Sequence, residues 1–151
     1  MLINTVASVF LLFAGFSTAF PHPSVPQMNE NVLETRASKD VNPNAVTGTT
    51  CTDRKAKIDN HDMNVATLGI CGGIQGAIQK CGGAPKSTVG QSGTAKFTLN
   101  PTAAGATINV SKGRWEGCIR AARAVCPAGS FKSVCKGGAS TGDVAFTLTN
   151  P

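Results

Sequence analysis

Six cysteines carry the clearest chemistry in this 151-residue chain. All six lie between Cys51 and Cys135, and an even number of cysteines in a small domain is typical of disulfides formed in an oxidising compartment. A zinc site is the alternative for clustered cysteines. However, no Cys-x-x-Cys pair has zinc-ligand spacing, and the only histidine beyond residue 36 is His61. We therefore expect three disulfides, no metal ion and no other cofactor.

Few side chains suit catalysis. General acid–base and nucleophilic mechanisms need positioned titratable groups, and residues 37–151 offer one histidine, one glutamate and no tyrosine. A ribonuclease-like enzyme, which remains an alternative, would need His61 and Glu116 to converge from two helices. Three aspartates lie near the expected start of a helix, where aspartate is favoured as a cap: Asp53, Asp59 and Asp62. We expect a non-enzymatic protein.

Basic residues give the chain a formal net charge of +6. Thirteen basic and six acidic residues follow Arg36, so residues 37–151 alone carry +7. A positive surface attracts anionic partners, although solubility explains such a charge equally well. The densest basic run is our candidate binding surface: Lys112, Arg114, Arg120 and Arg123. Glu116 is placed to pair with Arg120 at i,i+4.

The N-terminal 36 residues resemble segments that are removed during secretion. An apolar run over residues 1–16 is followed by small residues up to Ala19, which predicts a signal peptide over residues 1–19. Residues 20–36 are polar and proline-rich, and we interpret them as a propeptide removed after Arg36 or as a disordered tail. Residues 37–50 are expected to be a linker before the domain at 51–151. We therefore expect a secreted, extracellular protein.

Two amphipathic helices are predicted. Apolar residues at three-and-four spacing predict the first over residues 60–81, capped by Asp59 or Asn60. Its internal glycines indicate close packing against a neighbour, which we favour, or a bent or shorter helix. The second runs from a cap at Ser111 to Pro127 and turns Trp115 toward the core.

Alternating apolar and polar residues predict half-buried strands over residues 94–99, 106–110 and 144–149, with a weaker one over 55–58. The element order β-α-β-β-α-β is that of the split-βαβ plan. We therefore predict an α/β (α+β) sandwich of two layers, in which two helices cover one face of a four-stranded antiparallel sheet.

This topology suggests one of the fifteen possible disulfide pairings. Placing each cysteine on its predicted element gives the following pairs: Cys51–Cys81, Cys71–Cys118 and Cys126–Cys135.

The open face of the predicted sheet carries no aromatic side chain. Its expected side chains are lysine, threonine and asparagine: Lys55, Lys57, Lys96, Thr98, Thr107, Asn109, Thr147 and Thr149. RNA-recognition modules of this topology stack bases on aromatic residues of that face, so we expect no nucleic-acid partner. The apolar stripes of both helices are needed by the sheet, so we expect no stable membrane insertion. We expect a monomer.

One N-glycosylation sequon is present at Asn109-Val110-Ser111. Asn109 is predicted to face outward from its strand, where a glycan would not disturb the core.

The layout of this chain resembles that of a known family. The resemblance covers Cys51 to Pro151 and rests on the element order, the processing layout ending near Arg36 and two cysteines in each predicted helix: Cys71 and Cys81, and Cys118 and Cys126. These features are similar to those of small secreted cysteine-rich fungal effectors with the fold of the smut-fungus viral killer toxins. The resemblance implies a secreted protein that acts between organisms, and it implies no catalytic residues.

The leading hypothesis is a secreted effector-like protein that binds a host protein or cell-surface polymer, for example in the apoplast of a plant, and promotes colonisation or is perceived by the host. The alternative is a cationic antimicrobial protein of the killer-toxin type.

Overall fold

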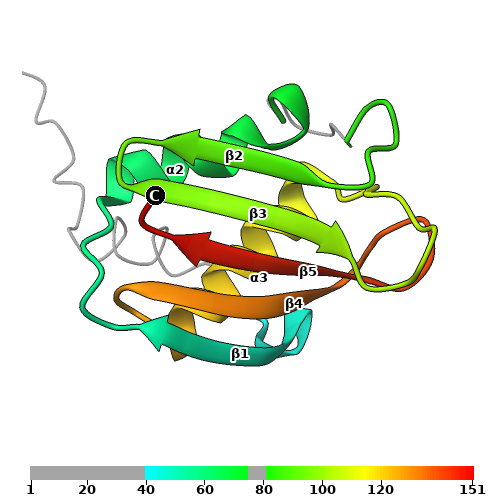
Figure 1. Ribbon diagram of the computed structural model, residues 1–151. Helices are drawn as coiled ribbons and strands as arrows, with labels where there is room; N and C mark the ends of the chain where they lie inside the picture. Colours follow the sequence, from blue (N-terminus) through cyan, green and yellow to red (C-terminus); the bar gives the residue numbers. More distant parts are fainter. Residues whose placement is uncertain (1–39, 75–80) are drawn as a thin grey trace, which may run out of the picture. The chain divides into compact units, whose positions relative to one another are not determined.

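The computed structural model describes residues 40–74 and 81–151, which contain one five-stranded antiparallel sheet and two helices (Figure 1). The sheet order is β1-β4-β5-β3-β2. The strands are β1 (Val46–Asp53), β2 (Thr88–Ser92), β3 (Ala95–Pro101), β4 (Ser130–Gly138) and β5 (Asp143–Thr149). The helices are α2 (Asn60–Gly69) and α3 (Lys112–Val125), with short 3-10 turns η1 (Pro43–Ala45) and η2 (Ile70–Gly72). The predicted signal peptide and propeptide, with Ala19 and Arg36, lie outside the described residues.

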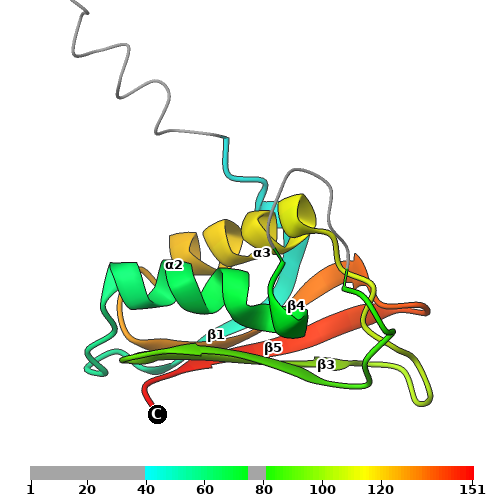
Figure 2. The same cartoon turned by 90° about the horizontal axis from the view of Figure 1, so that it is seen from above.

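Both helices lie on the same side of the sheet (Figure 2). Helix α2 contacts β2 and β3, and α3 contacts β1 and β4. The α+β class and the antiparallel sheet are therefore confirmed, whereas the expected number of four strands is wrong.

Two of the four predicted strands exist, as β3 and β5. The prediction of a strand at 55–58 is wrong, because β1 ends at Asp53 and a loop follows it. Residues 106–110 bury alternate side chains as expected but form only a single bridge, Ile108 to Ala139. The backbone hydrogen bonds of successive residues go to different segments: the Ile108 N–H donates to the carbonyl of Pro85, and the Asn109 N–H donates to the carbonyl of Gly138. The segment therefore cannot continue as a ladder.

Part of the segment expected to be a linker, 37–50, belongs to the sheet. Strand β1 begins at Val46, which is buried and pairs with Cys135 of β4. Gly48 has φ +63°, and the register shifts between Thr47 and Thr50, so two residues of β1 lie opposite Ser133 alone. This bulge turns Cys51 toward the same face as Val46.

Helix α2 begins as predicted and ends earlier than predicted. The Asp59 carboxylate accepts hydrogen bonds from the N–H groups of His61 and Asp62 at 2.7 and 3.3 Å, which is an N-cap. The helix ends at Gly69, and Cys71 adopts φ +57°, a left-handed conformation that stops an α-helix. The helix predicted over 60–81 therefore stops a dozen residues early, and its part over 75–80 lies outside the described residues.

Helix α3 follows the sequence prediction closely. The Ser111 hydroxyl accepts from the Arg114 N–H at 3.4 Å and caps the start. The helix ends at Val125, two residues before Pro127. Its apolar face buries Trp115, Cys118, Ile119, Ala121 and Ala122 against the sheet.

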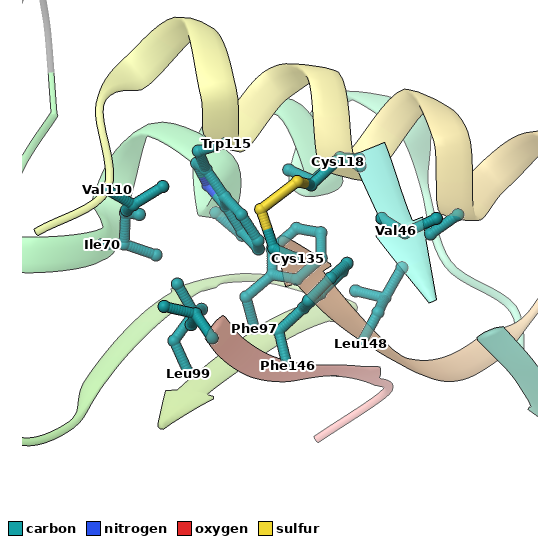
Figure 3. Close-up of a cluster of buried hydrophobic side chains, with 14 of the residues drawn as sticks. Val46, Ile70, Phe97, Leu99, Val110, Trp115, Cys118, Cys135, Phe146 and Leu148 are labelled. Carbon is teal, nitrogen blue, oxygen red and sulfur yellow. A yellow bond between two sulfur atoms is a disulfide. The ribbon is translucent and has the colours of Figure 1, made fainter. Parts of the chain in front are cut away.

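Trp115 lies at the centre of the core (Figure 3). Its ring meets Phe97 of β3 and Phe146 of β5 edge to face, with centroids 5.1 and 5.0 Å apart. Its indole N–H donates to the carbonyl of Thr67 at 2.9 Å. That carbonyl belongs to the last turn of α2, where helical carbonyls lack an intrahelical partner. Trp115 therefore joins both helices and the sheet.

Three disulfides are present, as predicted, but the predicted pairing is wrong. The observed pairs are Cys51–Cys126, Cys71–Cys81 and Cys118–Cys135, with Cα atoms 5.6, 5.2 and 5.5 Å apart. Strand β1 lies beside β4 under α3, which brings Cys51 to the end of α3 rather than to Cys81. Cys71 lies beyond α2, so it does not face Cys118. Cys118 instead lies on the buried face of α3 above β4 (Figure 3).

Candidate functional site

A hollow of about 510 Å³ lies between α2 and α3, and we call it the helix groove. Its volume is in the range of ligand sites in proteins. Both helices contribute five lining residues each: Asn60, Met63, Asn64, Thr67 and Leu68 from α2, and Lys112, Glu116, Ile119, Arg120 and Arg123 from α3.

The helical repeat explains which side chains of α3 reach the groove. Residues three or four apart share a helix face, so Lys112, Glu116, Arg120 and Arg123 lie along one edge of α3. Trp115 and Cys118 lie on the adjacent face and bind α3 to the sheet. The packing of Trp115 thus determines which edge of α3 faces α2.

Three of the four residues in the predicted binding surface line the groove. They are Lys112, Arg120 and Arg123. Arg114 does not belong to it. Its guanidinium donates from Nη1 to the carbonyl of Lys136 at 2.8 Å, and its side chain lies against Gly137 of β4.

Charge in the groove is partly compensated. Lys112 Nζ lies 2.7 Å from a carboxylate oxygen of Glu116, one helical turn away. The expected pairing of Glu116 with Arg120 is therefore wrong, because Glu116 turns back toward the start of the helix. With Lys112 and Glu116 neutralising each other, the two arginines give the groove a net positive charge. Arg120 is exposed.

Arg123 occupies a special position in the groove. Its Nη1 atom is buried and has no hydrogen-bond acceptor among the described residues. Burial lowers the pKa of the guanidinium from its usual value, although an arginine side chain stays charged at neutral pH. A buried N–H group without an acceptor costs free energy. Arg123 is thus a cation with unused hydrogen-bonding capacity.

Two amides on α2 complete the polar edge of the groove and were missed by sequence reasoning. Asn60 and Asn64 are one turn apart and both line the hollow. The sequence shows their i,i+4 spacing, but it does not show which face of α2 lies toward α3. Between the polar edges lie three apolar or thioether side chains: Met63, Leu68 and Ile119.

The residues considered for catalysis are separated or engaged. Glu116 lines the groove and pairs with Lys112, whereas His61 is exposed on the first turn of α2 and is not among the lining residues. The three aspartates accept backbone hydrogen bonds, as caps and turn residues do. The donors are the N–H groups of Lys55 for Asp53, of His61 for Asp59 and of Thr94 for Asp62.

Thr94 holds the Asp62 carboxylate with its backbone N–H and its hydroxyl, both at 2.8 Å. These bonds stabilise the ionised form and lower the pKa of Asp62 below its usual value, with smaller contributions from Ser92 and His61. Asp62 therefore fastens α2 to the turn between β2 and β3.

The sequon asparagine, Asn109, is exposed in the loop before α3 rather than on a strand. Ser111, the third residue of the sequon, caps α3. Glycosylation at Asn109 remains a prediction.

The open face of the sheet is lined mainly by polar side chains in register, with the exposed Val89 on the edge strand. One row crosses all five strands: Thr50, Lys132, Thr147, Thr98 and Val89. A hollow of about 310 Å³ lies on this face. Of the residues expected on it, Lys96, Thr98, Thr147 and Thr149 lie on strands β3 and β5, whereas Lys55, Lys57, Thr107 and Asn109 lie in loops.

Within residues 40–74 and 81–151, no helix has the length and apolar character needed to cross a bilayer. No model of a protein family, no curated protein and no solved structure matches the chain.

Proposed function

We propose that the protein is a secreted, non-enzymatic, effector-like protein that binds a host or cell-surface component through the helix groove. The observation that carries this proposal is the gathering of Lys112, Arg120 and Arg123 in one hollow, with the guanidinium of Arg123 short of acceptors. A cationic hollow favours an anionic component, because the field of the groove attracts it and charge-assisted hydrogen bonds then hold it.

The carboxylates of the described domain support binding rather than catalysis. Five of the six acidic side chains in the described residues are engaged: Asp53, Asp59, Asp62 and Asp143 each accept a backbone hydrogen bond, and Glu116 is paired with a lysine. The sixth, Asp40, is exposed at the start of the described residues. A general acid or base must instead be free to exchange a proton with a substrate.

Retention on tissue tests this proposal. Labelled protein, expressed from the full sequence and recovered from the culture medium, is infiltrated into leaf tissue. The fraction that stays on walls and membranes after washing at about 0.15 M salt is then measured. The test variant is the double reversal Arg120→Glu/Arg123→Glu. The matched control is Lys132→Glu/Lys136→Glu, which makes the same charge change on exposed residues of β4.

We expect the wild type and the β4 control to be retained and the groove variant to be lost, with all three unfolding at similar temperatures. Equal retention of both variants, or no retention of the wild type, would contradict the proposal. Reproducible turnover of an extracellular polymer or of RNA by the purified protein would also contradict it, and His61→Ala would then identify a ribonuclease-like site.

An antimicrobial function is favoured by one specific observation, the net charge of +6. It predicts growth inhibition of competing microbes that disappears in Arg120→Glu/Arg123→Glu. Inertness of the wild type against a broad microbial panel would exclude it.

A further inference from the structure

A second hollow adjoins the helix groove. This hollow, of about 480 Å³, is lined by the loop before α2 and the loop after α3. Its lining residues are Ala56, Lys57, Ile58, Asp59, Asn60, Thr94, Arg123, Pro127, Ala128 and Gly129. Asn60 and Arg123 line both hollows. The two hollows therefore adjoin at these residues, and we refer to the pair as the depression.

Arg123 lies where the two hollows meet, and its guanidinium has hydrogen-bond donors that lack acceptors in the described part of the chain. A guanidinium has five N–H donors in a planar fork, and it matches a carboxylate with two parallel hydrogen bonds. Its Nη1 is buried without an acceptor among the described residues. Because the side chain is long, a small rotation that brings the fork to a bound carboxylate would relieve this deficit. The amide of Asn60 lies at the same junction and adds a further donor and acceptor.

The apolar side chains of the helix groove, which we call its floor, favour some anionic partners over others. Met63, Leu68 and Ile119 line it between the two polar edges. Met63 is partly buried, and Ile119 is buried but keeps 6% of its surface exposed. A chain made only of charged or hydroxylated units has little apolar surface and gains less from this floor. A peptide with an apolar side chain gains from burying it there, and methionine adapts to varied shapes.

We propose that this depression binds an acidic peptide segment of a partner protein. One apolar side chain of the peptide packs on Met63, Leu68 and Ile119, a carboxylate binds the fork of Arg123, and Arg120 attracts a second carboxylate at the rim. This inference rests on the proposed function, because it specifies the component that the helix groove recognises. This proposal combines two known modes of peptide recognition: an apolar side chain anchored in a groove, and acidic residues bound by arginines.

A random peptide library tests the inference without a known partner. Displayed 12-residue peptides are selected on the immobilised full-chain protein, and the enriched consensus is synthesised with a fluorescent label. Anisotropy then gives its affinity for the wild type, for Arg123→Ala, for Arg123→Lys and for the control Lys136→Ala on β4. Oligogalacturonate at equal carboxylate concentration is added as a competitor.

We expect a consensus that combines acidic and apolar residues. Both Arg123 variants should weaken it about tenfold or more, because a lysine keeps the charge but loses the fork, whereas Lys136→Ala should leave it unchanged. Because Arg123→Lys preserves the charge and most of the packing, its loss of affinity reports the missing fork rather than misfolding.

Three results would overturn the inference. The first is that no peptide is enriched, and the second is a consensus without acidic residues. The third is that oligogalacturonate displaces the labelled peptide as effectively as the unlabelled peptide does. If tissue retention still depends on Arg120 and Arg123 in those cases, the proposed function stands and only the peptide is wrong. If retention also fails, the proposed function falls with it.

Discussion

At the scale of single residues, Trp115 shows how one side chain positions the helix groove. Its ring packs on β3 and β5, and its N–H bonds to the Thr67 carbonyl at the open end of α2. Thr67 itself lines the groove. The distance between the two helices therefore depends on a hydrogen bond that lies directly beneath the site.

Replacing this tryptophan with phenylalanine tests the bond. Trp115→Phe keeps an aromatic ring against Phe97 and Phe146 but leaves the Thr67 carbonyl without its donor and a gap beside it. We expect a loss of about 1–3 kcal/mol in the free energy of unfolding, measured by urea denaturation without reductant. A loss under about 0.5 kcal/mol would mean that water replaces the donor.

Asp62 makes stability depend on pH at the acid end. Thr94 lowers the pKa of this carboxylate in the folded state, so the stabilising effect is complete above the unfolded pKa of about 3.9 and is lost as the pH falls through the lower folded value. We expect the unfolding temperature to drop below about pH 4 and to drop less steeply in Asp62→Asn. The control is Asp40→Asn, which alters an exposed carboxylate and should keep the wild-type slope.

At the scale of elements, α2 approaches the sheet so closely that only glycine fits beneath it. A Cβ atom at Gly90 of β2 would clash with the carbonyl oxygen of Ala66, and Gly69 of α2 faces the same glycine. The sequence left open close packing through the helix glycines or a shorter helix, and the structure shows the shorter helix. Gly69 contacts Gly90 at an ordinary distance, and an added Cβ at Gly72 or Gly73 would meet nothing within 4 Å. The sequence did not indicate that the more constrained glycine is on the strand.

Gly90→Ala is therefore expected to destabilise the protein by about 1–3 kcal/mol or more, because the clash is with backbone and α2 must move outward. The matched control is Gly117→Ala in α3, where an added Cβ meets nothing within 4 Å. There we expect a gain of about 0.5–1 kcal/mol from helix propensity. Thermal unfolding of both variants measures the contrast, and similar effects in the two would refute this account of the packing.

The elements that sequence reasoning found are those with a strict period. Strands β3 and β5 alternate without interruption, and α3 has both a serine cap and a terminating proline. Strand β1 carries a bulge at Gly48, β2 has five residues with Gly90 at its centre, and β4 places Ser133 on its buried face. These features hide the alternation, because it is the neighbouring strands that decide which residues are buried.

The residues of the candidate site also fall into two groups: those that sequence periodicity predicts and those that only the tertiary packing reveals. The basic edge of α3 follows from helical periodicity, so Lys112, Arg120 and Arg123 could be named in advance. Arg114 could not be separated from them without knowing that β4 lies within its reach. The presence of Asn60 and Asn64 in the site could not be predicted, because it depends on how α2 packs beside α3, and these helices are far apart in sequence.

At the scale of the whole molecule, the disulfides differ in how much chain they constrain. Cys51–Cys126 closes 75 residues and fastens β1 to the end of α3, whereas Cys71–Cys81 closes 10. Loop-closure entropy gives about 4–5 kcal/mol for the first and about 3 kcal/mol for the second. We expect Cys51→Ala/Cys126→Ala to lower stability more than Cys71→Ala/Cys81→Ala in urea without reductant. The reverse order would show that local packing outweighs chain entropy.

The whole-molecule charge and the helix groove make different predictions about salt. Both double reversals lower the net charge from +6 to +2, so a long-range field would weaken binding equally in each. The Debye length is about 30 Å at 0.01 M salt and about 8 Å at 0.15 M. At low salt we therefore expect both variants to elute from washed leaf tissue earlier than the wild type. At 0.15 M the charges of β4 are screened from a partner in the groove, and only Arg120→Glu/Arg123→Glu should still elute early. If the two variants elute together at both salt concentrations, the partner responds to net charge alone, and the helix groove has no part in its recognition.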